Sequence, residues 1–178
     1  MTELHPQRIT IRGKAAHTFD RLPAKGAKAP GFFLPDSGYR DWSLEDFAGR
    51  SAILNVVPTL ESEASRDSAR KLVEALAGRR GAVALTISAD LPAALARWSS
   101  ELEGPNGKML STFRSPEFGM AYGTLIVEHE WMGLQARAVI ALDGEGTVMH
   151  RQLMGEATEE PDYAAALEAL GLERARKP

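Results

Sequence analysis

Two long apolar segments, each followed by a helix pattern, most constrain what this chain can fold into. Residues 52–57 read AILNVV and residues 82–88 read AVALTIS, with almost no polar interruption. A strand covered on both faces has this composition, whereas a strand with one wet face alternates. Apolar side chains recur at helical spacing after the first run, and Asp90 can cap a helix after the second. We therefore expect an α/β domain with parallel strands at its centre.

The later part of the chain adds antiparallel strands to this unit. Residues 138–142 and 147–150 are apolar or β-branched and flank the sequence DGEG, which is a good hairpin signal. Residues 161–170 have the pattern of an amphipathic helix that closes the chain. Two strand–helix units followed by a hairpin and a helix predict a mixed central sheet flanked by helices.

The N-terminal region predicts a separate small hairpin. Residues 8–13 read RITIRG, an alternating pattern that ends in Gly, and residues 16–20 follow after a short link. No later stretch is long or polar enough to be a linker between domains. We expect one domain over residues 1–178, with residues 1–20 as an N-terminal hairpin extension.

Composition excludes several classes of function. The 21 Lys and Arg are balanced by 24 Asp and Glu, so the formal charge is −3 and no basic block is present. This argues against a nucleic-acid binder or a protein of membrane surfaces. No apolar run approaches the roughly 20 residues that cross a bilayer, and residues 1–6 lack the pattern of a signal peptide, so we expect a cytoplasmic protein.

The absence of cysteine excludes disulfides, thiolate metal sites and cysteine nucleophiles in this chain. Its four histidines are scattered without metal-ligand spacing, and no glycine-rich phosphate loop is present. We therefore expect no metal and no cofactor. No serine lies in the glycine-flanked turn of a hydrolase nucleophile.

The turn after the first apolar run is the most informative place for chemistry. Residues 58–65 read PTLESEAS, so Ser62 can be the N-cap of a helix whose first turn contains Ser65. Unpaired N–H groups and the positive end of the helix dipole stabilise an anion at such a position. The alternative is that both serines are only capping residues.

Several blocks of sequence resemble the thiol peroxidase (Tpx) branch of the peroxiredoxins, and the resemblance runs from about Ile9 to Leu170. The matching blocks are residues 58–72, 87–92, 111–114, 117–118, 121–123, 134–139 and 158–163. The resemblance implies a thioredoxin-like fold, a homodimer, and reduction of hydrogen peroxide and organic hydroperoxides with thioredoxin as the reductant. In that reaction a peroxidatic cysteine becomes a sulfenic acid, which a resolving cysteine converts to a disulfide.

The family motif assigns roles to five positions of this chain. Pro58 and Arg137 match its Pro and Arg, and Ser62 stands where the family has Thr. Ser65 occupies the peroxidatic position and Ser99 the resolving position. A serine hydroxyl does not become an anion at neutral pH and has no sulfenic state, so the chain should be inactive as written. The alternative function is a pseudoenzyme that binds a small oxyanion or a partner protein through the same pocket.

Two origins of the serines remain open: substitutions made to trap a reduced-like state, or natural loss of the reaction. Ala64 and Trp98 also depart from the family pattern, which favours natural drift. Without reactive thiols, the helix should be continuous from about residue 62 to residue 77, with Ser99 helical and away from Ser65.

The surroundings of the site carry further expectations and their alternatives. Arg137 should face Ser65 by the motif, although an arginine in an apolar strand can simply pair with a carboxylate or reach solvent. Trp98, Phe113 and Phe118 are candidates for an apolar wall, with core packing as the alternative. Glu63, with Glu61 before it, adds negative charge that would oppose a thiolate at residue 65.

Overall fold

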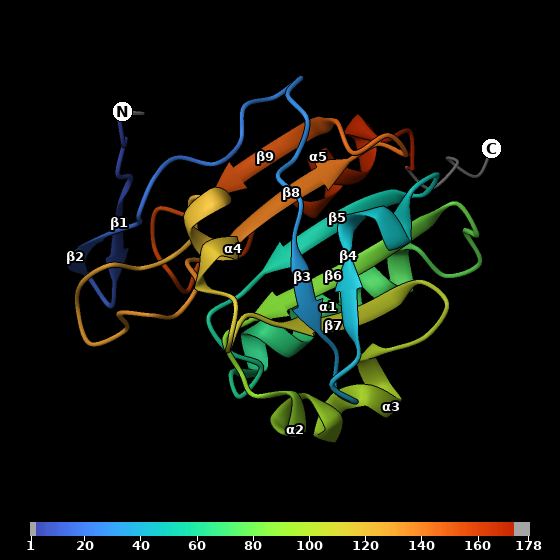
Figure 1. The fold of residues 1–178 in the computed structure, drawn as a ribbon, viewed down its shortest axis with the longest axis horizontal. Coiled ribbons are helices and arrows are strands. Elements are labelled where there is room, and N and C mark those ends of the chain that lie inside the picture. Colours follow the sequence, from blue (N-terminus) through green and yellow to red (C-terminus); the bar gives the residue numbers. More distant parts are fainter. Residues whose placement is uncertain (1–2, 173–178) are drawn as a thin grey trace.

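The structure, a computed structural model that describes residues 3–172, is built on a five-stranded sheet (Figure 1). The strand order is β7 (Gly107–Ser111), β6 (Ala82–Ser88), β5 (Ser51–Val56), β8 (Ala138–Leu142), β9 (Val148–Leu153). Strands β5, β6 and β7 are parallel, whereas β8 runs antiparallel to β5 and β9 antiparallel to β8. The predicted mixed sheet is confirmed, and its two apolar runs form the central strands because both faces are covered.

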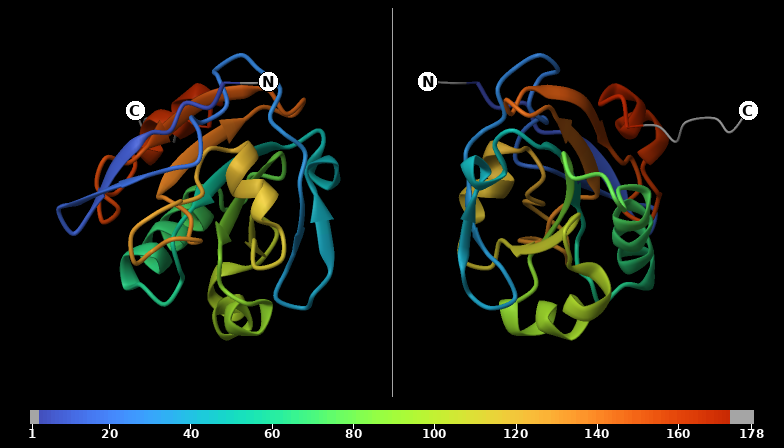
Figure 2. Two further views of the ribbon diagram at one scale, coloured as in Figure 1. Left: turned by 60° about the vertical axis from the view of Figure 1, so that its left-hand side comes forward. Right: turned by 90° about the vertical axis from the view of Figure 1, so that its right-hand side faces the viewer.

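Helices α1 (Glu63–Ala75) and α5 (Tyr163–Ala169) lie together on one face of the sheet (Figure 2). The side chains buried there come from β5, β6, β8 and both helices: Ile53, Leu72, Leu76, Ala82, Ala84, Val139, Ala141 and Ala166. Helix α1 ends where Leu76 caps it and Gly78 adopts a positive φ of 77°. The continuous helix expected over this segment is confirmed.

The opposite face is covered by α4 (Pro116–Ala121) and by a ribbon of β3 (Phe33–Pro35) and β4 (Asp41–Ser43) (Figure 2). A single 3₁₀ turn, η1 (Leu44–Phe47), follows β4 with the reciprocal Ser43–Asp46 bonds of a capping box. The largest apolar cluster of the described chain lies under these elements and includes Phe32, Phe118 and Tyr122.

The N-terminal hairpin is present as β1 (Arg8–Ile11) and β2 (Lys14–His17). Arg12 and Gly13 form its two-residue turn with positive φ of 52° and 77°, as the twist of a hairpin requires. Ile9 and Ile11 bury their side chains against the segments around residues 126, 136 and 157.

The segment between β6 and β7 differs from expectation. Instead of one helix it contains α2 (Pro92–Leu95), a 3₁₀ turn η2 (Ala96–Trp98) and α3 (Ser99–Leu102). The expectation that Asp90 caps the first helix here is wrong, because Leu91 is the N-cap. The Asp90 carboxylate instead binds the turn before α1, a tertiary partner that a local pattern cannot reveal. Within residues 3–172, no helix combines the length and the apolar composition needed to cross a bilayer.

Candidate functional site

The turn between β5 and α1 is held in place from the neighbouring strand β6. Pro58 is buried two residues after the end of β5. The Thr59 hydroxyl donates to the Asp90 carboxylate at 2.6 Å, and the backbone N–H of Leu60 donates to the other carboxylate oxygen at 2.7 Å. The Ser88 hydroxyl also donates to Asp90 at 2.8 Å. The start of α1 is therefore fixed relative to the carboxyl end of β6.

Ser62 is the N-cap of α1, as predicted, but its side chain is exposed and makes no capping hydrogen bond. Its carbonyl accepts from the N–H groups of Ser65 and Arg66, each at 3.2 Å. The N–H groups of Glu63 and Ala64, the first two of the helix, have no partner within the helix, so they remain available to a ligand. The role in the site that the family motif gives to Ser62 stays a prediction.

Ser65 and Arg137 meet beneath this helix start. The side chains are 1% and 3% exposed, and Arg137 Nη2 donates to Ser65 Oγ at 3.3 Å. Arg137 directly precedes β8, which pairs with β5 and so brings residue 137 beside α1. The expected orientation of Arg137 toward Ser65 is found, whereas the chemical roles of Pro58, Ser62, Ser65, Ser99 and Arg137 remain proposals.

A buried polar layer under Ser65 was missed by the sequence analysis. Asn55 Nδ2 donates to Ser68 Oγ at 3.0 Å and lies 3.4 Å from Thr86 Oγ1, and Ser68 Oγ donates to the Ser65 carbonyl at 2.8 Å. The hydroxyl of Tyr163 is buried against Ser68 without a hydrogen bond of good geometry, and burial raises the pKa of Tyr163. The sequence signal that could have predicted this layer was Asn55, a single polar residue inside an otherwise apolar strand.

Ser99 lies apart from the Ser65 pocket. It begins α3, is partly exposed, and donates its hydroxyl to the Ala96 carbonyl at 3.0 Å. The expectation that Ser99 is helical is confirmed, and its hydroxyl makes no contact with Ser65. The neighbouring Trp98 ring lies 4.3 Å from the Arg66 guanidinium, so Trp98 covers the first turns of α1.

Phe118 and Phe113, the other two candidates for an apolar wall of the site, lie in different environments. Phe118 is 2% exposed and packs against Phe32 and Tyr122 in the core, so the core-packing alternative holds for it. Phe113 is exposed and meets Tyr39 edge-on, with ring centroids 6.4 Å apart. Neither ring contacts Ser65.

Phe113 lines an open apolar groove of about 720 Å³ at the carboxyl ends of β6 and β7, which we call the apolar groove. Five of its side chains are exposed and large: Leu91, Phe113, Met120, Val127 and Met132. Buried Gln135 forms part of its lining and links Thr124 to Thr112 by hydrogen bonds of 2.7 and 3.2 Å. An uncovered apolar surface of this kind is typical of a binding face.

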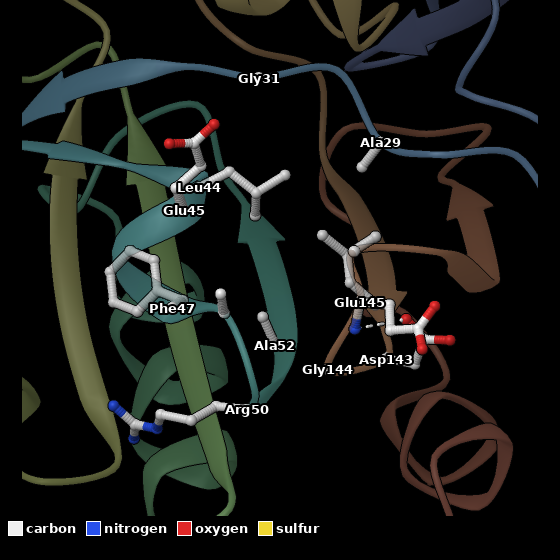
Figure 3. A pocket seen from close by; sticks show the side chains of 13 residues that line it. Ala29, Gly31, Leu44, Glu45, Phe47, Arg50, Ala52, Asp143, Gly144 and Glu145 are labelled. Carbon is white, nitrogen blue, oxygen red and sulfur yellow. Dashed lines mark hydrogen bonds between the residues drawn. The ribbon is translucent and has the colours of Figure 1, made fainter.

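A smaller hollow of about 280 Å³ lies at the amino end of β5, away from Ser65. Figure 3 shows Leu44 and Glu45 of η1 on one side of it and the β8–β9 turn with Asp143 and Glu145 on the other. The Asp143 carboxylate accepts from two N–H groups of its own turn, so it is already satisfied. No predicted site residue lines this hollow. In the part of the chain that the structure describes, no three His, Cys, Asp or Glu side chains are placed to hold a metal ion.

Comparison with known proteins identifies relatives of this chain. The Redoxin family matches residues 24–167. A thiol peroxidase of Leptospira interrogans is 36% identical over 164 residues, which cover 91% of this chain and 96% of that protein. A thiol peroxidase of Mycobacterium tuberculosis is 37% identical over 163 residues, which cover 92% of this chain and 98% of that protein. The chain belongs to the thiol peroxidases.

Solved structures show the same fold. A peroxiredoxin-like protein from Aquifex aeolicus superposes with a TM-score of 0.84 at 27% identity, covering 94% of this chain and 99% of that one. A thiol peroxidase from Chromobacterium violaceum superposes with a TM-score of 0.82 at 24% identity, covering 90% and 93% of the two chains. The thioredoxin-like fold expected from the sequence is confirmed. This thiol peroxidase family member has no cysteine, so it lacks the thiols on which the family's reaction depends.

Proposed function

We propose that this chain keeps the residues that bind a ligand in a thiol peroxidase site and lacks the cysteines that carry out the reaction. The observation that carries the proposal is the 3.3 Å contact between buried Arg137 and the hydroxyl of Ser65 at the start of α1. The cation and the helix N-terminus stabilise negative charge on an oxygen or sulfur atom at this point. The nucleophile that would use this stabilisation is absent, because a serine hydroxyl stays protonated at neutral pH and forms no sulfenic acid.

The activity of the parent site follows from the family. It is the reduction of hydrogen peroxide and organic hydroperoxides with thioredoxin as the reductant, a role in antioxidant defence. Thioredoxin use, a cytoplasmic location and a single domain stay predictions for this chain. The family resemblance also implies a homodimer, and the apolar groove supports this because its five large exposed side chains have no cover in one protomer.

The alternative is a pseudoenzyme that binds a small oxyanion or a partner protein through the same pocket. One observation favours the oxyanion. In residues 3–172 the only acceptors of Arg137 are neutral oxygens, the Ser65 hydroxyl and the Glu159 carbonyl, the latter at 3.3 Å. A guanidinium without a carboxylate partner is suited to bind an anion.

The test is peroxide-dependent oxidation of NADPH in the presence of thioredoxin and its reductase. We expect no turnover from the chain as written and partial turnover from a Ser65→Cys, Ser99→Cys double variant. Recovery should be incomplete because Glu63 lies in the first turn of α1 and forms no ion pair with any described residue. Glu61 matters less, since it pairs with Arg97.

The Ser99→Cys single variant is the matched control and should show no turnover. Turnover by the unmodified chain would mean that the chemistry lies on other residues. A folded double variant without any activity would mean that the pocket itself no longer binds or activates peroxide.

A further inference from the structure

Arg137 is a buried cation without a counter-ion. Its side chain is 3% exposed, and its two hydrogen bonds, both at 3.3 Å, go to the Ser65 hydroxyl and the Glu159 carbonyl. Its Nε atom is buried and has no acceptor among the described residues. No carboxylate of residues 3–172 lies within ion-pair distance of it, since every ion pair there involves other cations.

The acidic residues next in sequence to the two acceptors of Arg137 do not neutralise it, and Glu63, two residues before Ser65, is exposed and forms no ion pair with Arg137. The Glu160 carboxylate holds Lys71 at 2.6 Å, and the Glu159 carboxylate accepts from the backbone N–H of Glu156 at 3.4 Å. Asp67, on the same helix as Ser65, pairs with Arg70. None of the last three groups is free to neutralise Arg137 without breaking another contact.

The charge of the pocket therefore depends on residue 65. With a thiolate at this position, the negative sulfur and the Arg137 guanidinium sum to zero, and a neutral hydroperoxide enters a neutral site. With Ser65, the same pocket carries one uncompensated positive charge, which is costly in a buried environment. A ligand that brings one negative charge removes this cost, whereas a neutral ligand does not.

The remaining groups around Ser65 are suited to the same ligand. The start of α1 presents backbone N–H groups and the positive end of the helix dipole, and α1 is 13 residues long. The Tyr163 hydroxyl is buried nearby, lacks a well-formed hydrogen bond, and interacts electrostatically with Arg137. Ser65 and Arg137 are 1% and 3% exposed, so a ligand has to be small to reach them from the exposed side of the helix start.

We propose that the Ser65–Arg137 pocket binds a small monovalent oxyanion of the carboxylate or nitrate kind as the counter-ion of Arg137. The replacement of a thiolate by Ser65 thus reverses the preference of the pocket, from a neutral hydroperoxide to an anion. This inference rests on the proposed function, because it concerns the same pocket, and it specifies the charge and size of the ligand.

The experiment titrates the ¹⁵N-labelled chain with formate and follows the amide signals of Ala64 and Ser65. Bulky sulfonate buffer keeps the ionic strength constant, and formamide is the neutral control of equal size. We expect saturable shifts with formate and none with formamide. A Ser65→Ala variant keeps the uncompensated cation but loses the hydroxyl beside it, so it should bind formate more weakly and still in preference to formamide.

Two variants remove the charge imbalance. Arg137→Met deletes the cation, and Ser65→Asp supplies a built-in carboxylate; each should weaken formate binding by about tenfold or more, the effect of losing one close charge pair. Equal binding of formate and formamide would overturn the proposal, and so would unchanged formate affinity in Arg137→Met. If circular dichroism shows that Ser65→Asp does not fold, the comparison of formate binding between Ser65→Ala and Arg137→Met tests the proposal instead.

The outcome is independent of the peroxidase test. A chain that ignores formate while its double cysteine variant reduces peroxide would contradict only the anion proposal. Formate binding together with an inert double variant would support the anion proposal and contradict retention of the peroxide-activating site.

Discussion

The carboxylate of Asp90 fixes the turn that leads into α1. It accepts hydrogen bonds from the Thr59 hydroxyl, the Leu60 N–H and the Ser88 hydroxyl, all between 2.6 and 2.8 Å. Hydrogen bonds to a charged acceptor are stronger than neutral ones, so three on one partly buried carboxylate make a rigid joint. Asp90 is therefore a positioning residue for Ser65.

Asp90→Ala should destabilise the protein by about 1–3 kcal/mol, because three donors lose their acceptor and part of the turn is buried. Urea unfolding followed by tryptophan fluorescence measures the change. Asp90→Asn is the matched control and should cost less, since its amide oxygen still accepts. An alanine variant as stable as the parent would show that these contacts do not hold the turn.

Asp36 at the turn of the β3–β4 ribbon provides a test through pH. Burial raises its pKa, but hydrogen bonds from Trp42, Gly38 and Arg40 and the charge of Lys108 outweigh burial and lower the pKa below the usual 3.8. A lowered folded-state pKa contributes stability that is present above the unfolded value and is lost as pH falls through the folded value. The stability gap between the parent and Asp36→Asn should therefore be full at pH 6 and shrink below about pH 4. Urea titrations across this range measure it, and a constant gap would contradict the assignment.

At this scale the sequence predicted which residues meet at the candidate site but not what holds them. Ser65 and Arg137 came from a motif, and the structure places them in contact. Two of the three partners of Asp90, Thr59 and Leu60, lie in the turn after β5, about 30 residues away in sequence, so no local pattern could reveal them. Phe118 could not be assigned to wall or core from its type alone, because both environments favour aromatic rings.

Three side-chain contacts join the start of α1 to residues 97–101. Glu61 pairs with Arg97, the Arg66 guanidinium lies over the Trp98 ring, and Arg70 Nε donates to Glu101 at 2.7 Å. The family reaction requires the helix around residue 65 to unwind so that two distant sulfurs can bond. In this chain the three contacts oppose that movement.

A prediction follows for disulfide formation in the Ser65→Cys, Ser99→Cys background after one equivalent of peroxide. Adding Trp98→Ala removes a contact worth about 1 kcal/mol, so the disulfide should form roughly fivefold faster. Intact mass after alkylation gives the rate. Arg114→Met breaks a remote ion pair with Asp41 and should leave the rate unchanged. Equal rates in all three proteins would mean that these contacts do not control unwinding.

Elements with strong periodicity were predictable, and those set by tertiary contacts were not. The apolar runs became β5 and β6, and the amphipathic stripe became α1, because burial alone decides such segments. Residues 92–102 have an ordinary helical composition, yet they divide into three short turns. Trp98 adopts φ −108° and ψ 0° at the last division while packing beside Arg66, a partner that is distant in sequence.

At the scale of the whole molecule, the apolar groove predicts a homodimer. Met132 is 69% exposed on its rim, so a charge placed there would be buried by a second protomer. Met132→Glu should convert the dimer to a monomer in light scattering at micromolar concentration. Phe33→Glu is the control, because Phe33 is 71% exposed but lies outside the groove. A monomeric parent, or a dimer that tolerates Met132→Glu, would contradict this interface.

The mixed sheet could be expected from the sequence, but its strand order could not. Two strand–helix units and a hairpin allow several arrangements, and the family resemblance implied a thioredoxin-like fold without stating a strand order. The order β7-β6-β5-β8-β9 matters for the site, because pairing β8 with β5 places Arg137 beside α1.

The pKa of the new thiol in a Ser65→Cys single variant tests most directly whether the anion-stabilising half of the site survives. Thiolate absorbance at 240 nm, or the rate of alkylation, gives this value across pH, with Arg137→Met in the same background as the control. Arg137 and the start of α1 should hold the thiol pKa clearly below the ordinary value of about 8.5, and removal of Arg137 should raise it. Glu63 should keep it from falling as far as a catalytic thiol. A thiol pKa at or above about 8.5, unchanged by Arg137→Met, would contradict the account.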